Sequence, residues 1–218
     1  LSLMRLLFSF PMPILLALAL NEITSVRYKK ITQTIIYLPH FIGWVVVYTI
    51  LQGFLSQADG IVNQVIVMFG GKKIPFLASE PWFRPVMILS EIWKEAGWGT
   101  VVYLAALAGI DPAIQEAAMI DGANRWQRIR YIFLPCILST VTVMLIMRMG
   151  TILNNGLEQT LLFQNSMNID VSEVLETYSY SVGLKQGRFA FGTAIGLFQS
   201  VVGCIMVFVS NFISKKTG

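Results

Sequence analysis

Five long apolar blocks are the feature that most limits what this chain can fold into. They run over residues 3–20, 35–55, 85–110, 132–153 and 189–213. A helix of about 20 apolar residues crosses the hydrocarbon core of a bilayer, and a helix satisfies its backbone hydrogen bonds internally, as lipid requires. Only 13% of the 218 residues are charged, against about a quarter in soluble domains. The sequence therefore predicts an all-α protein, a polytopic bundle of five membrane-spanning helices.

The basic residues predict which segments face the cytoplasm. Residues 21–34, 111–131 and the C-terminal tail carry eight Lys and Arg in 40 positions, whereas residues 56–84 and 154–188 carry five in 64. Since cytoplasmic loops are enriched in Lys and Arg, the first set is predicted to be cytoplasmic and the second external. This topology places residue 1 outside, so a sixth, N-terminal span is expected in the complete protein.

Several functions are disfavoured by what the sequence lacks. The net charge of +4 comes from short basic clusters between apolar blocks, which argues against nucleic-acid binding. The run 70–73, Gly-Gly-Lys-Lys, lacks the spacing of a phosphate-binding loop, so no ATP hydrolysis is expected in this chain. His40 is the only histidine, and it is expected to be packed or interfacial rather than catalytic. No metal site is predicted, and neither Cys136 nor Cys204 belongs to a CxxC pair.

The polar stretch 111–132 predicts a helix–turn–helix elbow on the cytoplasmic side. Asp111 and Pro112 suit an N-cap and a first helical residue, and residues 112–121 read as a short helix. Gly122 permits a left-handed turn, after which a second helix leads into the fourth block. Small residues on the first helix suit docking of another protein, although a simple connecting helix explains the same pattern.

The same stretch resembles a known motif. Glu116-Ala117-Ala118, three residues, Gly122, nine residues and then residues 132–135, Ile-Phe-Leu-Pro, match the EAA loop, EAA-x3-G-x9-I-x-L-P, of inner-membrane permeases in binding-protein-dependent ABC importers. Asp121, in the sequence Asp-Gly-Ala, also resembles the loop of the carbohydrate-uptake branch of this family. The segments before and after the loop also resemble sugar permeases, and those after it resemble permeases for oligosaccharides or polysaccharides.

The resemblance implies a fold, a function and partners. It implies the type I ABC importer permease fold, with residues 1–218 as one transmembrane permease domain in the bacterial cytoplasmic membrane. The resemblance implies a complex of two permeases, the second of them a different chain. Two cytoplasmic ATPases that bind ATP and Mg, and an extracellular solute-binding protein, complete it. No cofactor is expected in this chain. The loop would couple to the ATPase through these residues: Glu116, Ala117, Ala118, Asp121, Gly122 and Arg125.

The substrate path is predicted from residue types. Intramembrane charges are costly and usually functional or paired; Glu91, Lys94 and Glu95 lie in the third block and Arg148 in the fourth. Sugar recognition favours aromatic rings and planar polar groups. The candidate path residues are therefore Trp93, Glu95, Arg148, Asn154, Asn155 and Tyr178. An internal ion pair, or an aromatic belt at the membrane interface, explains the same residues equally well.

Three further expectations concern the external segments and the function. Residues 61–69 predict a short helix too short to span, and the long segment 154–188 is expected to hold helices of its own or a function. Gly192 and Gly196 form a GxxxG pattern that permits close helix approach. The alternatives to a carbohydrate permease are an ABC permease for a non-sugar solute and a stand-alone secondary transporter.

Overall fold

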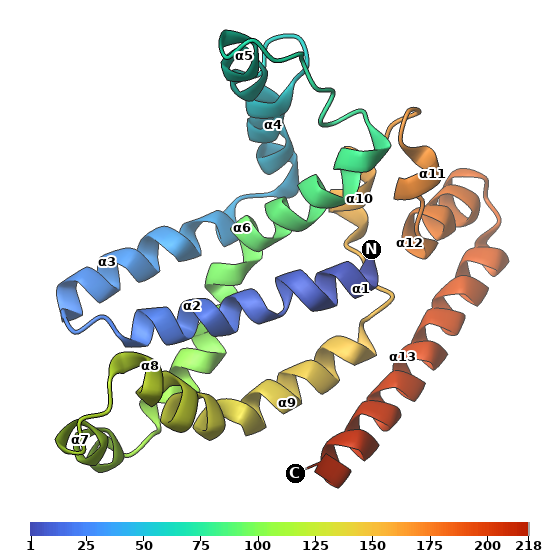
Figure 1. Ribbon diagram of the computed structural model, residues 1–218. Coiled ribbons are helices and arrows are strands. Elements are labelled where there is room, and N and C mark those ends of the chain that lie inside the picture. Colours follow the sequence, from blue (N-terminus) through green and yellow to red (C-terminus); the bar gives the residue numbers. More distant parts are fainter. Residues whose placement is uncertain (218) are drawn as a thin grey trace. The chain divides into compact units, whose positions relative to one another are not determined.

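The computed structural model describes residues 1–217 as helices joined by loops, with no β-strand in that range (Figure 1). Three helical segments are long and apolar enough to cross a membrane individually: Ser2–Asn21, Arg125–Gly150 and Phe189–Lys216. Two bent helix pairs raise the number to five if each pair is counted as one span. The predicted all-α membrane protein is confirmed.

The described residues form two compact units, and the first consists of Leu1–Arg5, Ile42–Glu91 and Thr151–Cys204. Its core joins Phe83, Val86 and Met87 to Phe163. Both segments predicted to be external belong to this unit. Its elements are α1 (Ser2–Met4), α4 (Trp44–Leu55), α5 (Ile61–Met68), the start of α6 (Glu80–Ala108), α10 (Leu157–Phe163), α11 (Ile169–Ser172), α12 (Leu175–Ser179), the π-helical turn η4 (Tyr180–Lys185) and much of α13 (Phe189–Thr217).

The second unit consists of Leu6–Phe41, Ile92–Gly150 and the residues from Ile205 onward. Its core comprises six buried side chains, Ala17, Leu18, Tyr103, Leu107, Phe133 and Ile137. All three segments predicted to be cytoplasmic belong to it. Its elements are most of the π-helical turn η1 (Arg5–Ser9), α2 (Pro11–Asn21), α3 (Val26–Tyr37), the 3₁₀ turn η2 (Leu38–Phe41), the rest of α6, α7 (Pro112–Ile120), α8 (Arg125–Arg128), the π-helical turn η3 (Ile129–Phe133), α9 (Leu134–Gly150) and the end of α13.

The second predicted span, residues 35–55, is wrong as a single straight helix. Helix α3 with its 3₁₀ turn η2 meets α4 at a bend of 101°. Pro39 has no N–H to continue the α-helical hydrogen-bond ladder, and Gly43 has an extended backbone as the N-cap of α4. The 12 residues of α4 rise only about 18 Å at 1.5 Å per residue. Helices α3 and α4 are therefore long and apolar enough to cross a membrane only when they are counted together.

The third predicted span has different boundaries from those expected. Helix α6 begins at Glu80, contains Pro85 within it and ends at Ala108. It qualifies as a span only together with α7, from which it is bent by 77°. The charged residues Glu91, Lys94 and Glu95 interrupt the apolar sequence of α6. Two predicted path residues, Trp93 and Glu95, lie on this helix, and the predicted coupling loop follows it in the chain.

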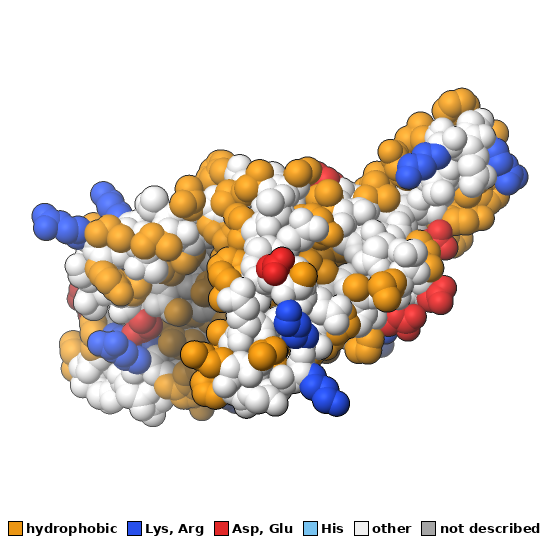
Figure 2. Space-filling view, turned by 90° about the horizontal axis from the view of Figure 1, so that it is seen from above, with side chains coloured by type: hydrophobic (Ala, Val, Ile, Leu, Met, Phe, Trp, Pro, Cys, Tyr) orange, Lys and Arg blue, Asp and Glu red, His pale blue; other side chains and the backbone are white. Residues whose placement is uncertain are grey.

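The external segments carry the helices that their length predicted. Helix α5 covers most of 61–69, while α10, α11, α12 and η4 fill 154–188. Figure 2 shows hydrophobic side chains in patches among the backbone and other side chains, with Lys, Arg, Asp and Glu at scattered places. Helix α13 exposes large apolar side chains such as Leu197, Phe208 and Phe212, and such a helix surface suits lipid rather than water.

Candidate functional site

The predicted elbow is present and its ends are capped as expected. Asp111 accepts a hydrogen bond from the N–H of Ala113 at 2.9 Å, and Pro112 occupies the first turn of α7. At the other end Gly122 has φ +78°. The N–H of Ala123 donates to the carbonyl of Ala118 at 2.9 Å, and that of Gly122 to Met119 at 3.1 Å. This is a Schellman motif, in which the left-handed residue is normally glycine.

The second half of the elbow starts from its own cap. The Asn124 side chain accepts from the N–H of Gln127 at 2.9 Å, while the Gln127 side chain accepts from the N–H of Asn124 at 2.8 Å. This reciprocal pair is a capping box. It begins α8, which continues through η3 into α9. Two caps around one left-handed glycine therefore fix the turn between the two helices.

Helix α7 is mostly exposed, because none of its residues is buried and only Gln115 and Ala118 are half-buried. Glu116 and Ala117 are exposed and Ala118 is half-buried. Ile114, Met119 and Ile120 add exposed apolar surface, with Ile120 86% exposed. Beside the helix lies a cavity of about 340 Å³, lined in part by Ala118, Asp121 and Gly122. Three of the six predicted coupling residues are thus brought together around one hollow.

Arg125, the remaining predicted coupling residue, belongs to a charge cluster that the sequence analysis did not identify. Glu22, from the end of α2, lies 3.1 Å from Nη2 of Arg128 and 3.9 Å from Nε of Arg125. The Glu22 and Arg128 side chains are 14% and 16% exposed, whereas Arg125 is 75% exposed. The i,i+3 spacing of the two arginines was the only signal, and it carries no information about Glu22. The Glu22–Arg128 pair ties the elbow to α2.

We expect Arg128→Ala to destabilise the protein much more than Arg125→Ala. Removing Arg128 leaves the Glu22 carboxylate largely buried without its closest partner, at a cost of about 1–3 kcal/mol. Arg125 is mostly in solvent, where an ion pair contributes about 0–1 kcal/mol. Thermal unfolding in detergent measures both variants. Equal shifts in Tm would show that the buried pair does not hold the elbow.

Two of the predicted path residues lie in the second unit on α6. Glu95 accepts a hydrogen-bonded or ionic contact from Nδ1 of His40 at 2.7 Å and from Nζ of Lys94 at 2.8 Å. The Trp98 ring stacks on the imidazole of His40 at 4.7 Å, with the planes 2° apart. Trp93 is 48% exposed. His40 is packed, as predicted, and Trp98 is the aromatic side chain joined to this charged cluster.

Arg148 lies half-buried in the last turn of α9. In the structure Arg5 forms an ion pair with Glu91 at 3.2 Å, and Glu95 pairs with His40 and Lys94. Arg5 lies near the start of the first apolar block, and its distant partner Glu91 could not be inferred from the sequence.

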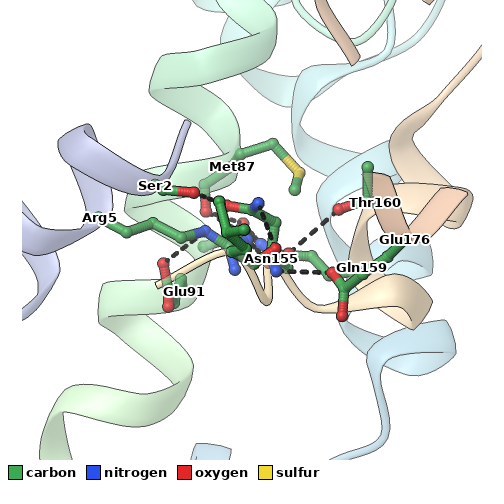
Figure 3. Close-up of polar contacts among 10 residues, drawn as sticks. Ser2, Arg5, Met87, Glu91, Asn155, Gln159, Thr160 and Glu176 are labelled. Atoms are coloured by element: carbon green, nitrogen blue, oxygen red, sulfur yellow. Dashed lines mark hydrogen bonds and ion pairs between the residues drawn. The ribbon is translucent and has the colours of Figure 1, made fainter. Parts of the chain in front are cut away.

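The other predicted path residues lie in the first unit, next to a buried polar network (Figure 3). Asn155 is 5% exposed; its side-chain oxygen accepts from Ser2 at 3.0 Å, and its N–H donates to Glu176 at 2.6 Å. Asn154 is exposed. Tyr178 is 39% exposed and lines a cavity of about 420 Å³ that Asn155 also borders. Asn155 is therefore buried and hydrogen-bonded within the protein, whereas Tyr178 is the more accessible of the two residues.

The centre of the network is Gln159, which is 1% exposed. Its amide donates to the carbonyl of Met87 at 2.9 Å and to the hydroxyl of Ser90 at 3.0 Å, and its oxygen accepts from Arg5 at 2.5 Å. Figure 3 shows Arg5 reaching from the N-terminal helix toward Glu91 and Gln159. The network joins three distant segments of the chain.

Known proteins are similar to this chain in sequence. The chain is 47% identical over 211 residues to Protein LplB of Bacillus subtilis and 48% identical over 209 residues to that organism's polygalacturonan/rhamnogalacturonan transport system permease protein YteP. These alignments cover 97% and 96% of the chain but 66% and 65% of the relatives, so the chain spans just under two thirds of their length.

Solved structures agree with the sequence comparison. A crystal structure of a bacterial ABC transporter involved in the import of the acidic polysaccharide alginate matches with a TM-score of 0.94 and 46% identity, over 99% of this chain and 75% of that one. The alginate transporter in complex with an alginate pentasaccharide-bound periplasmic protein matches with a TM-score of 0.94 and 45% identity, over the same shares. The expected ABC importer permease fold is confirmed.

A family model described as binding-protein-dependent transport system inner membrane component matches residues 9–217. That range contains the capped elbow, the bent helix pair α3–α4 and the cluster of His40, Lys94 and Glu95. The chain belongs to this family of inner-membrane permease components.

Proposed function

We propose that this chain is the permease subunit of an ATP-driven importer that moves an oligosaccharide or polysaccharide across the bacterial cytoplasmic membrane. The observation that carries the proposal is the elbow: a mostly exposed helix α7, bearing Glu116, Ala117 and Ala118 and held at both ends by caps. The names of YteP and of the alginate transporter support a carbohydrate substrate.

The proposed coupling partner is a cytoplasmic ATPase. The exposed apolar side chains of α7 and the adjoining cavity offer a surface that a groove in another protein can enclose. Two such ATPases, a second and different permease, and an external solute-binding protein complete the proposed assembly. ATP and Mg would be bound by the ATPases. The C-terminus is proposed to be cytoplasmic, since the predicted cytoplasmic segments all belong to the second unit.

The proposed mechanism is alternating access. ATP binding draws the ATPases together, and α7 moves with them because its caps make the elbow stiff. The transmembrane helices then open outward to the docked binding protein, and hydrolysis returns them to the inward-facing state. The coupling requires the partners to bind the two states with different affinities. Trp93, Glu95, Arg148 and Tyr178 remain the proposed contacts of the sugar along the path, with Asn154 and Asn155 at its external end.

Glu116→Lys is expected to abolish ATP-dependent uptake and to remove the ATPase from the purified complex. The substitution reverses a fully accessible charge on the docking helix, and an unfavourable charge at an interface costs several kcal/mol. Saccharide uptake into sealed membrane vesicles measures the first effect, and co-purification of the ATPase measures the second. The control is Glu158→Lys, which makes the same charge change at an exposed position of α10 in the first unit. Unchanged uptake and association in Glu116→Lys would refute the coupling proposal.

A further inference from the structure

A cavity of about 430 Å³ lies in the first unit, beside the start of α13. None of the residues proposed above for the elbow or the substrate path lines this cavity. Its polar and aromatic lining side chains come from α12, η4 and α13: Glu176, Ser179, Tyr180, Phe189, Thr193 and Gln199. Its size falls within the range of about 300–1,000 Å³ usual for small-molecule sites.

The wall of this cavity is built by glycines. A Cβ on Gly192 would lie 3.0 Å from the Cα of Gly183, so η4 and α13 pack backbone against backbone. The hydroxyl of Ser179 donates to the carbonyl of Gly192 at 3.3 Å across the same junction. Gly192 thus provides the close approach that its GxxxG pattern predicted, within the chain itself, whereas a Cβ on Gly196 would meet open space.

The lining holds hydrogen-bonding capacity that the chain does not use. Nε2 of Gln199 is buried and has no hydrogen-bond partner, a condition that costs about 1–3 kcal/mol and calls for an explanation. The carboxylate of Glu176 accepts one bond, from the N–H of Asn155, and has room for more donors. Thr193 donates to the carbonyl of Phe189 at 2.9 Å, and its oxygen can still accept.

One amide donor, several acceptors and an exposed aromatic ring, Phe189, match a ligand rich in hydroxyl groups, since each hydroxyl both donates and accepts. The carboxylate of Glu176 opposes an anionic group. The face of the Tyr180 ring, which could otherwise attract a cation, is already occupied by the Lys185 ammonium, 5.2 Å from the ring centre. We propose that the cavity is an external subsite for one uncharged, hydroxyl-bearing ring of the saccharide, an inference that rests on the proposed carbohydrate transport.

Protection of an engineered cysteine tests the subsite directly. Thr193→Cys is placed in the full chain with Cys136→Ala and Cys204→Ala, and its modification by an uncharged maleimide is followed with and without cellotriose, xylotriose, mannotriose or trigalacturonate. At least one neutral trisaccharide is expected to slow modification by more than about threefold. Ser200→Cys is the control, since Ser200 does not line the cavity and its hydroxyl bonds to its own helix. Protection by none of the probes, or by trigalacturonate alone, would overturn the proposal.

A second variant separates binding from structure. Gln199→Leu is expected to raise the saccharide concentration needed for protection by about tenfold, as loss of one buried hydrogen bond of about 1.4 kcal/mol predicts. It should leave Tm unchanged or raise it, because an unpartnered buried amide is removed. A lowered Tm with unchanged protection would assign Gln199 to the fold and refute the subsite. Uptake without protection would refute only the subsite, whereas protection without ATP-dependent uptake would refute only the proposed transport.

Discussion

Arg5→Met is expected to destabilise the protein by about 3–5 kcal/mol, the usual cost of removing one partner of a buried ion pair. The Arg5 side chain is 4% exposed and that of Glu91 is 12% exposed. Without the guanidinium, Glu91 loses the ion pair at 3.2 Å, and the oxygen of Gln159 loses the Arg5 donor. The N-terminal helix is then no longer held to α6 and α10 through this network. Thermal unfolding of the purified chain in detergent measures the effect.

A double variant shows how much of that loss comes from the stranded charge. Arg5→Met with Glu91→Leu removes both charges, and apolar replacement of a buried pair is often nearly neutral. We therefore expect the double variant to be more stable than Arg5→Met alone. Arg27→Met, at an exposed position of α3, removes one positive charge and should change Tm little. An Arg5→Met protein as stable as Arg27→Met would show that the pair contributes nothing to stability.

The elbow was predictable from the sequence because its determinants are local. Asp111 and Pro112 begin α7, and Gly122 ends it, through interactions within a few residues of each other along the chain. The same reasoning explains the correct prediction of α5 and of α13. Capping residues, a left-handed glycine and an uninterrupted apolar run act on the backbone directly, so they do not need to know what packs against them.

The buried charge clusters were not predictable, because their partners are remote in sequence. Arg5 and Glu91 come from different helices, as do Glu22 and Arg128. Intramembrane charges are known to need partners, but helical spacing identifies only neighbours on the same helix. The sequence could therefore flag Glu91 and Glu95 as unusual without assigning Arg5 or His40 to them.

The broken second span failed for a different reason. Residues 35–55 are apolar enough to span, and hydropathy does not register the direction of a helix axis. The signals were Pro39 and Gly43, which together end one helix and begin another. Pro85 lies inside α6 without ending it, because a single missing ladder donor is tolerated in membrane helices when the rest of the helix continues. Proline alone therefore does not mark the break; Pro39 followed by the extended Gly43 does.

Gly97→Ala is expected to lower stability strongly, although alanine is the better helix former by about 1 kcal/mol. Gly97 lies on α6 where α3 packs against it. A Cβ there would overlap the carbonyl oxygen and carbon of Ile36, which are backbone atoms and cannot rotate aside. Small residues at such contacts allow membrane helices to approach closely, and forcing two backbones apart costs typically about 1–3 kcal/mol and occasionally more.

Gly53→Ala provides the matched test, because the same substitution on α4 should have the opposite sign. A Cβ on Gly53 would meet no other atom within 4 Å, so only the gain in helix propensity remains. The Tm in detergent is expected to fall for Gly97→Ala and to stay or rise for Gly53→Ala, with Gly97→Val worse than Gly97→Ala. If both alanine variants raised Tm, α3 and α6 would not be in backbone contact at Gly97. A fall in Tm for Gly97→Ala alone would establish that α3 can pack closely against α6 because Gly97 has no side chain.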